Sequence, residues 1–565
     1  MPTPDLSRLR AAAFVLAIVP LASCRVGDAR VPDAPEDAQT PEAMSGPPSG
    51  TGSYDDLLAL HAEFRGLERF ETVDGVTDYG DAAVDRARGR ITDFQSRLQD
   101  MAVASWPLSR QVDYLVVRGM VDQAHFELEV FRPWERDPGF YVDPLLRTAF
   151  VELPAEGADR ERLEARLARV TPTLAAARAT LDAAAADYAD LAIYNLENGD
   201  GVGHGHPYRA EPPAGVIGWY DDLLGRARTE QPDLIPAISE ARDAIVDFRD
   251  WLVEQRPTMT APAGVGREAF DWYLRQVKLM PYSVDELLVM GEGAYERLTA
   301  RLVLERHRNR ALPELELPAD AAEYQRRIDE ADRHIRGFLD DHDIITVPAS
   351  VGRLGTNVPW IERPQGPNFW EQIQYRDPRP DHVHAVIPGH RFDGAMARAV
   401  DHPIRSGYSD GGRVEGWGTY LEEALMDAGL LDDFPRTREL FVIFGMKRAV
   451  RVHADIMMQL NELTVPEAVT YMVERVPWLD EDVARVDAEI YLRRPPGYGL
   501  SYMIGKLQID ALLADRSRQQ EDAFDLRAFH DEFMALGRLP VALLRWEMTG
   551  LDDEIRELWE WTPVR

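Results

Sequence analysis

Three histidines lie within nine residues near the middle of the chain, at His382, His384 and His390, in a sequence that holds 13 histidines altogether. Neutral imidazoles beside a carboxylate are common zinc ligands in proteins, so this density indicates a metal site. Glu415 and Glu422 follow, seven residues apart, and therefore share one face of a helix. Either carboxylate could complete a site of two histidines and one carboxylate.

Two of these histidines need a broken helix in order to meet. His384 and His390 are six residues apart, which on an unbroken helix leaves them roughly 120° away from a common face. Pro388 cannot donate the hydrogen bond that the carbonyl of His384 would accept, and Gly389 follows it. We therefore expect a break or bulge at Pro388 and Gly389 that brings His390 round to His384.

The same residues also fit a purely structural role. In that reading the histidines and carboxylates form a hydrogen-bond network, and Trp417 and Tyr420 are ordinary core residues. From spacing alone, both readings stay open.

The elements around these residues are predicted to be helices. Apolar residues recur at spacings of three and four, with charged outer faces, which is typical of amphipathic helices. The predicted helices span residues 54–70, 81–101, 110–131, 160–188, 236–255, 267–278, 283–308, 320–341 and 435–460. Ser283 and Glu286 form a capping box at the start of one of them. The β-branched run Ile344–Val347, which stops at Pro348, predicts a strand in a small β-sheet.

The N-terminus is typical of an exported lipoprotein. Arg8 and Arg10 precede a short apolar run over residues 11–22, which is too short to span a bilayer. The run ends at Cys24, the only cysteine, in a Leu-Ala-Ser-Cys sequence that resembles a bacterial lipobox. We predict a signal peptide over residues 1–24, a flexible tether over 25–53 and a helical domain over 54–565, with possible lobes at 54–260 and 261–565. The alternatives for the first segment are an ordinary cleaved signal and an apolar start without a targeting role.

These features predict an envelope protein that is bound to the membrane through lipid on Cys24 and faces the periplasm or the exterior. The chain carries 63 basic and 97 acidic residues, a net charge of −34, which argues against nucleic acid as a partner. A loop over residues 198–215 contains His204 and His206, which we interpret as loop residues rather than metal ligands. The sequence has no phosphate-binding glycine loop and no Gly-x-Ser-x-Gly motif, so serine nucleophile chemistry is disfavoured.

Several motifs occur in an order that resembles a known family. They comprise His384, Pro388, Gly389 and His390; Glu415, Gly416, Trp417, Tyr420 and Glu422; Arg451 and Asp455; Pro496, Gly497, Tyr502 and Gly505; and Phe529, His530, Asp531, Gly537 and Pro540. The chain is similar in these positions to the bacterial family labelled domain of unknown function 885. That family resembles the gluzincin metallopeptidases in fold and often occurs as envelope lipoproteins.

The resemblance implies a mainly α, large multi-helix, metallopeptidase-like fold with a deep cleft. By the same resemblance, His384, His390 and Glu415 would bind Zn²⁺, and Tyr502 would donate a hydrogen bond to the oxyanion of a tetrahedral intermediate. Glu422 would orient a ligand histidine or replace a missing base. We interpret His530 as structural and Arg451 with Asp455, four residues apart on one helix, as an internal ion pair.

The departures from the family pattern concern catalysis. Ala385 stands where the family has a glutamate that would act as general base, a role worth about 10²–10⁴ in rate. Asp393 and Tyr498 replace two glutamines, and Gln459 replaces a histidine; all of these positions are expected to line the cleft. No clear equivalent exists for an arginine ahead of Pro496, although Arg493 and Arg494 are close.

Two functions therefore stay open. The first is a zinc metallohydrolase of peptidase type, in which metal-activated water attacks an amide of a peptide or other small envelope substrate, with impaired or altered catalysis. The second is a catalytically silent pseudoenzyme that binds peptides or envelope components in the inherited cleft. A lipoprotein without any ligand is a third alternative.

Overall fold

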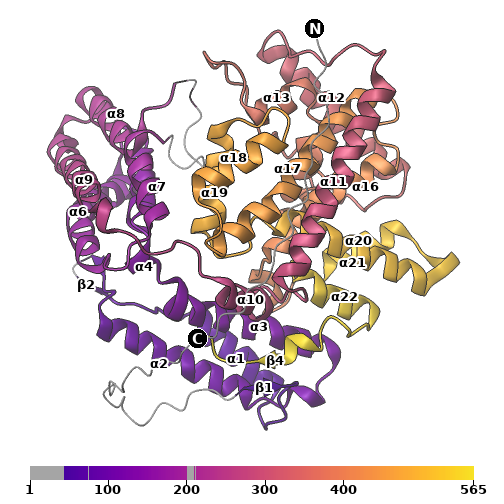
Figure 1. The fold of residues 1–565 in the computed structure, drawn as a ribbon, viewed down its shortest axis with the longest axis horizontal. Coiled ribbons are helices and arrows are strands. Elements are labelled where there is room, and N and C mark those ends of the chain that lie inside the picture. Colours follow the sequence, from indigo (N-terminus) through magenta and orange to yellow (C-terminus); the bar gives the residue numbers. More distant parts are fainter. Residues whose placement is uncertain (1–42, 74, 200–208, 210, 565) are drawn as a thin grey trace, which may run out of the picture. The chain divides into compact units, whose positions relative to one another are not determined.

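Helices make up most of the chain in the computed structural model, which describes residues 43–73, 75–199, 209 and 211–564 (Figure 1). The predicted mainly α fold is confirmed. The α-helices are α1 (Tyr54–Arg65), α2 (Asp81–Gln99), α3 (Leu108–Phe126), α4 (Pro133–Arg136), α5 (Gly139–Ala149), α6 (Gly157–Thr180), α7 (Ala186–Glu197), α8 (Gly215–Glu230), α9 (Ile235–Gln255), α10 (Arg267–Gln276), α11 (Val284–Asn309), α12 (Ala321–Asp341), α13 (Phe369–Arg376), α14 (Arg379–Asp381), α15 (His390–Ala397), α16 (Gly411–Asp427), α17 (Pro435–Gln459), α18 (Val465–Arg475), α19 (Glu481–Arg493), α20 (Ser501–Gln520), α21 (Leu526–Ala535) and α22 (Val541–Thr549). Two π-helical turns, η2 (Glu127–Phe131) and η5 (His382–Val386), and short 3₁₀ turns, η1 (Val103–Ser105), η3 (Pro232–Leu234), η4 (Arg256–Thr258), η6 (Arg405–Gly407), η7 (Glu521–Ala523) and η8 (Glu557–Trp559), link them.

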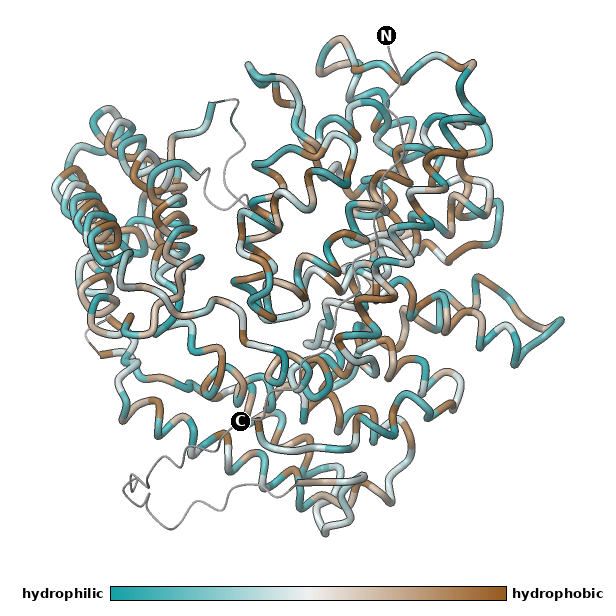
Figure 2. The backbone as a smooth tube through the Cα atoms, in the orientation of Figure 1, coloured by the Kyte–Doolittle hydropathy of each residue, from teal (hydrophilic) through white to brown (hydrophobic). Residues whose placement is uncertain are grey.

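Cys24, His204 and His206 lie outside the described residues. In the part of the chain that is described, no helix is both long and apolar enough to cross a membrane. Brown and teal residues alternate along most of the helices in Figure 2, as expected where one face of a helix is buried. The predicted boundary between two lobes near residue 260 stays a prediction.

Most predicted helices occur close to their expected bounds, and the capping box of Ser283 and Glu286 is present at the start of α11. The predicted helix over residues 160–188 is wrong in one respect, because it is divided into α6 and α7. The residues between them leave the helix to form other backbone hydrogen bonds. The N–H of Ala183 donates to Glu135, and the N–H of Ala185 donates to Arg136.

Strands are few and short. β1 (Met44–Ser45) pairs antiparallel with β4 (Glu560–Trp561), and β2 (Thr72–Val73) pairs antiparallel with β3 (Val76–Thr77). Residues just after β1 are also held, because the N–H groups of Gly50 and Gly52 donate to Met101 and Asp100. The folded unit therefore includes the last part of the predicted tether.

The prediction of a strand at Ile344–Val347 is wrong. This segment has irregular backbone, and its polar groups bind side chains of α21 instead of a neighbouring strand. The carbonyl oxygen of Ile344 lies 2.7 Å from Nδ1 of His530, and the N–H of Thr346 donates to Asp531 over 3.0 Å. Tyr420 Oη contacts the other ring nitrogen of His530 at 2.9 Å, so His530 has the structural role that we predicted.

His530 makes the stability of the fold dependent on pH. Burial lowers the pKa of His530 to about 4, whereas an unfolded histidine has a pKa of about 6.5. The unfolded chain therefore binds this proton first, and the stabilisation is complete above about pH 6.5 and is lost as the pH falls towards 4. We expect protonation of His530 to lower the free energy of unfolding by about 3 kcal/mol over that pH range. Urea unfolding of the protein and of His530→Gln at several pH values measures this loss. Below pH 6.5 the free energy of unfolding of the variant should depend less steeply on pH. Equal dependence in both proteins would show that His530 does not cause the loss.

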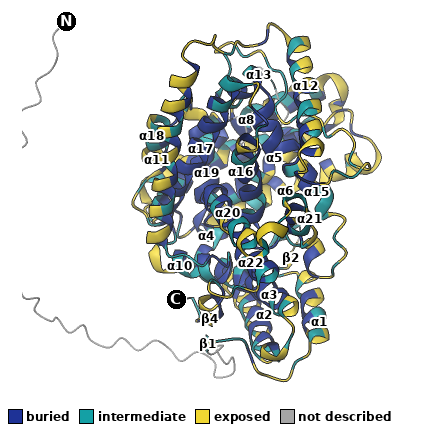
Figure 3. Cartoon of the chain, turned by 90° about the vertical axis from the view of Figure 1, so that its right-hand side faces the viewer, coloured by how far each residue is buried: buried dark blue, intermediate teal, exposed yellow. Residues whose placement is uncertain are grey.

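The centre of the fold is formed by long buried helices. α17 packs along α11, and α16 packs along α20. Figure 3 shows α16 and α17 mostly in dark blue, whereas α1 and α12 carry yellow, exposed faces. α16, α17 and α20 carry most of the candidate site residues, so these side chains are placed in the interior of the protein.

Two glycines let α16 and α20 approach closely. A Cβ atom at Gly505 would lie 2.1 Å from the carbonyl oxygen of Gly412, and one at Gly416 would lie 2.5 Å from the backbone of Gly505. Any side chain at these positions would push the two helices apart. Since α16 carries Glu415 and α20 carries Tyr502, the glycines set the spacing of the site.

Gly505→Ala is therefore expected to destabilise the protein by about 1–3 kcal/mol, because the added methyl group meets backbone that cannot move without separating α16 from α20. The matched control is Gly337→Ala in α12, where an added Cβ meets nothing within 4 Å. That control should be neutral, or stabilising by up to about 1 kcal/mol through helix propensity. Denaturant unfolding measures both, and equal effects of the two substitutions would show that the close approach does not limit stability.

Candidate metal centre

The predicted break at Pro388 and Gly389 is present. The chain leaves the π-helical turn η5 at Ile387, and α15 begins at His390. The indole Nε1 of Trp417, on α16, donates to the carbonyl oxygen of Pro388 over 2.9 Å and fixes the turn against α16. As a result the rings of His384 and His390 meet at a centroid distance of 4.6 Å and an angle of 80°.

Glu415 completes a cluster with these two histidines. Its Oε2 atom lies 3.1 Å from Nε2 of His390 and 3.6 Å from Nε2 of His384. The three residues each offer one ligand atom, and these atoms lie within 4.8 Å of one another. Tetrahedral zinc with ligands about 2.1 Å away sets neighbouring ligand atoms about 3.4 Å apart, so the two shorter distances fit a shared ion.

The hydrogen bonding of Glu415 also fits a cation. Its Oε1 atom accepts a hydrogen bond from Tyr498 Oη over 2.8 Å. Its Oε2 atom is buried and, within the described residues, accepts no hydrogen bond. A buried carboxylate oxygen without a donor is costly, and a bound metal ion would satisfy it. The residues present therefore fit a zinc ion.

The charges at the cluster support the same reading. Burial alone would lower the pKa of His384, and Arg448 adds to that effect, but Glu415 and Glu422 outweigh both and raise it. Burial would raise the pKa of Glu415, but the charge of His390 and contacts with both histidines hold it well below its usual range. The carboxylate is thus ionised, and His384 lies where positive charge is favoured.

Glu422 contacts His384 from the side opposite Glu415. Its Oε1 atom lies 2.8 Å from Nδ1 of His384 and 3.5 Å from Nη2 of Arg448. Gly418 leaves room for the ring, because a Cβ there would lie 2.7 Å from Nδ1 and Cε1 of His384. A carboxylate on the outer nitrogen fixes the orientation of a ligand histidine and leaves Nε2 free to bind metal.

Tyr502 lies beside the cluster. Its ring stacks on His384 at 6.3 Å and 12°, and its hydroxyl donates to Tyr498 Oη over 3.3 Å. Burial is the main reason that the pKa of Tyr502 is raised well above its usual range, and so its hydroxyl keeps its proton. The structure thus places Tyr502, Tyr498 and Glu415 in one hydrogen-bonded chain.

Two arginines of α17 border Tyr502, and the sequence analysis had not assigned either to the site. The guanidinium carbons of Arg451 and Arg448 lie 4.2 and 5.2 Å from the ring centroid of Tyr502. The predicted ion pair between Arg451 and Asp455 is wrong. Arg451 reaches Asp487 of α19 at 3.2 Å, while Asp455 accepts from the N–H of Leu500. Arg448 and Arg451 could have been identified from the sequence, because arginines within an otherwise apolar helix such as α17 are unusual.

The departures from the family pattern divide into two groups. Tyr498 contacts the cluster, and Ala385 is buried next to His384 in η5. Asp393 and Gln459 belong to the scaffold instead, because Asp393 pairs with two arginines, Arg413 and Arg538, and Gln459 donates to the carbonyl of Tyr491.

The two arginines close to the expected position ahead of Pro496 differ in their contacts. The guanidinium carbon of Arg494 lies 5.0 Å from the ring centroid of Tyr498. Arg493 forms ion pairs with Asp137, Asp143 and Glu489 and so ties α19 to the segment that begins α5. It is therefore not available to a ligand at the cluster.

Comparison with solved structures identifies proteins of similar fold. One, classed as a candidate lipoprotein of unknown function from Shewanella oneidensis, is 18% identical, with a TM-score of 0.62 over 88% of this chain and 100% of that one. Another, a candidate lipoprotein from Colwellia psychrerythraea, is 14% identical, with a TM-score of 0.64 over 88% of this chain and 99% of that one. These likenesses show the fold alone.

No curated protein matches the sequence. A family model described as "Bacterial protein of unknown function (DUF885)" matches residues 60–367 and 376–548, which include every residue of the metal cluster and its neighbours on α16, α17 and α20. The chain therefore belongs to the DUF885 family of bacterial proteins.

Proposed function

We propose that this protein is a cell-envelope lipoprotein in which His384, His390 and Glu415 hold a zinc ion at a centre of metallohydrolase type that acts on peptide amides. The observation that carries the proposal is the buried Oε2 of Glu415, which has no hydrogen-bond donor in the described chain and lies close to Nε2 of both histidines. The Leu-Ala-Ser-Cys24 sequence and the description of two proteins of similar fold as candidate lipoproteins support the anchor.

The side chains around the cluster have distinct roles in this proposal. When bound, zinc polarises a carbonyl oxygen and lowers the pKa of water, which is the chemistry of amide hydrolysis. Glu422 holds the ring of His384 in place through Nδ1. Tyr498 orients the carboxylate of Glu415 through Oε1. Tyr502, with its proton retained, donates to the oxyanion of a tetrahedral intermediate.

Arg448 and Arg451 add positive charge on the same side. Among the residues described, Nε and Nη1 of both arginines are buried without a hydrogen-bond partner. Buried guanidinium groups beside Tyr502 favour negative charge that develops on a substrate there. His390, whose side chain is 28% exposed against 6% for His384, marks the side from which a substrate reaches the cluster.

Ala385 supports a second candidate, a silent binding protein. Alanine cannot accept a proton. Glu422, the other carboxylate that contacts His384, already forms ion pairs with His384 and Arg448. The proposed hydrolysis is therefore slow, and in the alternative it does not occur at all. The alternative retains zinc and peptide binding without turnover.

A Tyr502→Phe variant separates these two candidates. If the protein is a hydrolase, loss of the hydroxyl should lower kcat for peptide cleavage by about 10²–10³, as for removal of one oxyanion donor, and leave zinc content unchanged. The measurement is cleavage of a peptide library by the zinc-loaded full chain in detergent. If the wild-type protein binds peptides but does not cleave them, it is the binding protein without turnover. If Tyr502→Phe cleaves peptides as fast as wild type, Tyr502 has no part in the mechanism.

A further inference from the structure

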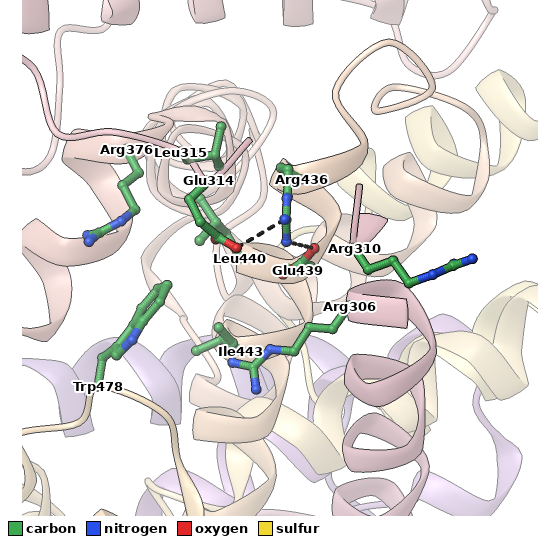
Figure 4. Close-up of a pocket in the computed structure, with 10 residues that line it drawn as sticks. All are labelled: Arg306, Arg310, Glu314, Leu315, Arg376, Arg436, Glu439, Leu440, Ile443 and Trp478. Atoms are coloured by element: carbon green, nitrogen blue, oxygen red, sulfur yellow. Dashed lines mark hydrogen bonds and ion pairs between the residues drawn. The ribbon is translucent and has the colours of Figure 1, made fainter. Parts of the chain in front are cut away.

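A cavity of about 320 Å³ lies beside the first turns of α17 (Figure 4). Its walls come from the C-terminal end of α11, the end of α13, the first turns of α17 and the loop that holds Trp478. None of the residues that line the cavity belongs to the cluster or to the tyrosines and arginines that border it. The cavity is therefore a different site from the cluster.

The cavity is basic in a protein that is strongly acidic. Four arginines line it, Arg306, Arg310, Arg376 and Arg436, against two glutamates, in a chain of net charge −34. One of the four is neutralised, because Arg436 pairs with both glutamates, Glu314 and Glu439, at 3.0 Å each. The dashed lines in Figure 4 mark these two contacts.

The remaining arginines have no carboxylate partner in the described part of the chain. Arg306 makes no hydrogen bond or ion pair there, Arg310 donates to the carbonyl of His307, and Arg376 donates to the carbonyl of Gln372. Arg306, in the last turn of α11, and Arg310, directly after its end, are four residues apart, where like charges repel. Burial lowers the pKa of Arg376, and the charge of Glu314, which pairs with Arg436, only partly offsets this effect. Arg306 and Arg310 are exposed and Arg376 is half-buried, so an anion that enters the cavity can pair with all three.

Trp478 gives the cavity an aromatic wall. Trp478 is 45% exposed. Its backbone φ of 66° lies in the left-handed region, which bulky residues rarely adopt. Such strain is characteristic of functional positions. The guanidinium carbon of Arg376 lies 4.9 Å from the indole centroid. In Figure 4, Arg376 and Trp478 lie on one side of Ile443, and Arg306 lies on the other.

We propose that this cavity binds a small anion that carries a flat ring, such as an aromatic phosphate or carboxylate. The anionic group lies between Arg306 and Arg376, and the ring packs on Trp478 above Leu440 and Ile443. The volume is at the low end of the range for small-molecule sites, which limits the ligand to about one ring with its charged group.

Calorimetric titration of the full chain in detergent with phenyl phosphate tests this proposal. Phenyl phosphate should bind saturably at one site and at least tenfold more tightly than either inorganic phosphate or benzyl alcohol, which each supply half of the ligand. Binding should be the same before and after treatment with a chelator. Loss of binding on chelation would place the phosphate on the metal cluster and overturn the proposal.

Variants assign the binding to the cavity. Arg306→Gln and Arg376→Gln should each weaken phenyl phosphate binding at least tenfold, and Trp478→Ala should weaken phenyl phosphate but not inorganic phosphate. Arg306 has no partner in the described fold, so its variant is expected to fold normally. The control is Arg308→Gln, an exposed arginine of the same helix that does not line the cavity. No saturable binding, or equal weakening by Arg308→Gln, would overturn the proposal.

Discussion

Replacing Ala385 by glutamate is expected to raise the rate of zinc-dependent peptide cleavage by about 10²–10⁴. The substitution restores a carboxylate directly after the ligand His384, where it can take a proton from the attacking water. The other requirements for hydrolysis are retained in this proposal, since the three ligands converge and Tyr502 is adjacent. Single-turnover cleavage of a peptide by wild type and Ala385→Glu, each loaded with zinc, measures the gain.

Ala385→Gln is the matched control for this substitution. Glutamine has nearly the shape of glutamate but cannot accept the proton, so its rate should stay at the wild-type level. Position 385 is buried, and the melting temperature of each variant shows whether the larger side chain is tolerated. An Ala385→Glu protein that is folded, holds zinc and cleaves no faster than the glutamine variant would mean that the centre is not of hydrolase type.

The second large effect concerns the metal itself. The wild-type chain should contain about one zinc ion. The double variant His384→Ala, His390→Ala should contain almost none, because it keeps only Glu415 of the three proposed ligands and one carboxylate binds zinc weakly. Elemental analysis of the purified proteins, after equal exposure to zinc and removal of excess metal, gives the stoichiometry.

His382→Ala is the control for the double variant. This neighbouring histidine is buried like His384, but its Nε2 lies 3.0 Å from Asp332 and it takes no part in the cluster. Its loss should leave the zinc content at about one. Metal-free wild-type protein, or zinc that persists in the double variant, would contradict the assignment of the centre.

Local sequence signals predicted the parts of the fold that depend on local chemistry. The spacing of apolar residues predicted the long helices, and the missing N–H of Pro388 predicted the break that lets His384 and His390 meet. The run Ile344–Val347 was misread because β-branched residues favour extended backbone without indicating a partner. Its partners are His530 and Asp531, nearly two hundred positions later in the chain.

Local sequence signals likewise predicted one part of the candidate site, whereas another part depends on contacts between distant segments. Residue types and the resemblance to a family predicted which side chains cluster, namely His384, His390 and Glu415, and their binding of a metal stays a prediction. The roles of Tyr498 and Arg448 were not predicted, because both depend on how closely the helices pack. Tyr498 reaches Glu415 only because Gly505 allows α20 to lie against α16.

The pairing of β1 with β4 determines how the protein responds to mechanical load. A pull along the chain ahead of Met44 is carried first by the two antiparallel strands and by the hydrogen bonds of Gly50 and Gly52 to Met101 and Asp100, which follow α2. Glu560 and Trp561, at the far end of the sequence, therefore share the force with the first residues of the fold. Tension applied ahead of Met44 would therefore load this junction before it reaches the segments that carry the candidate ligands.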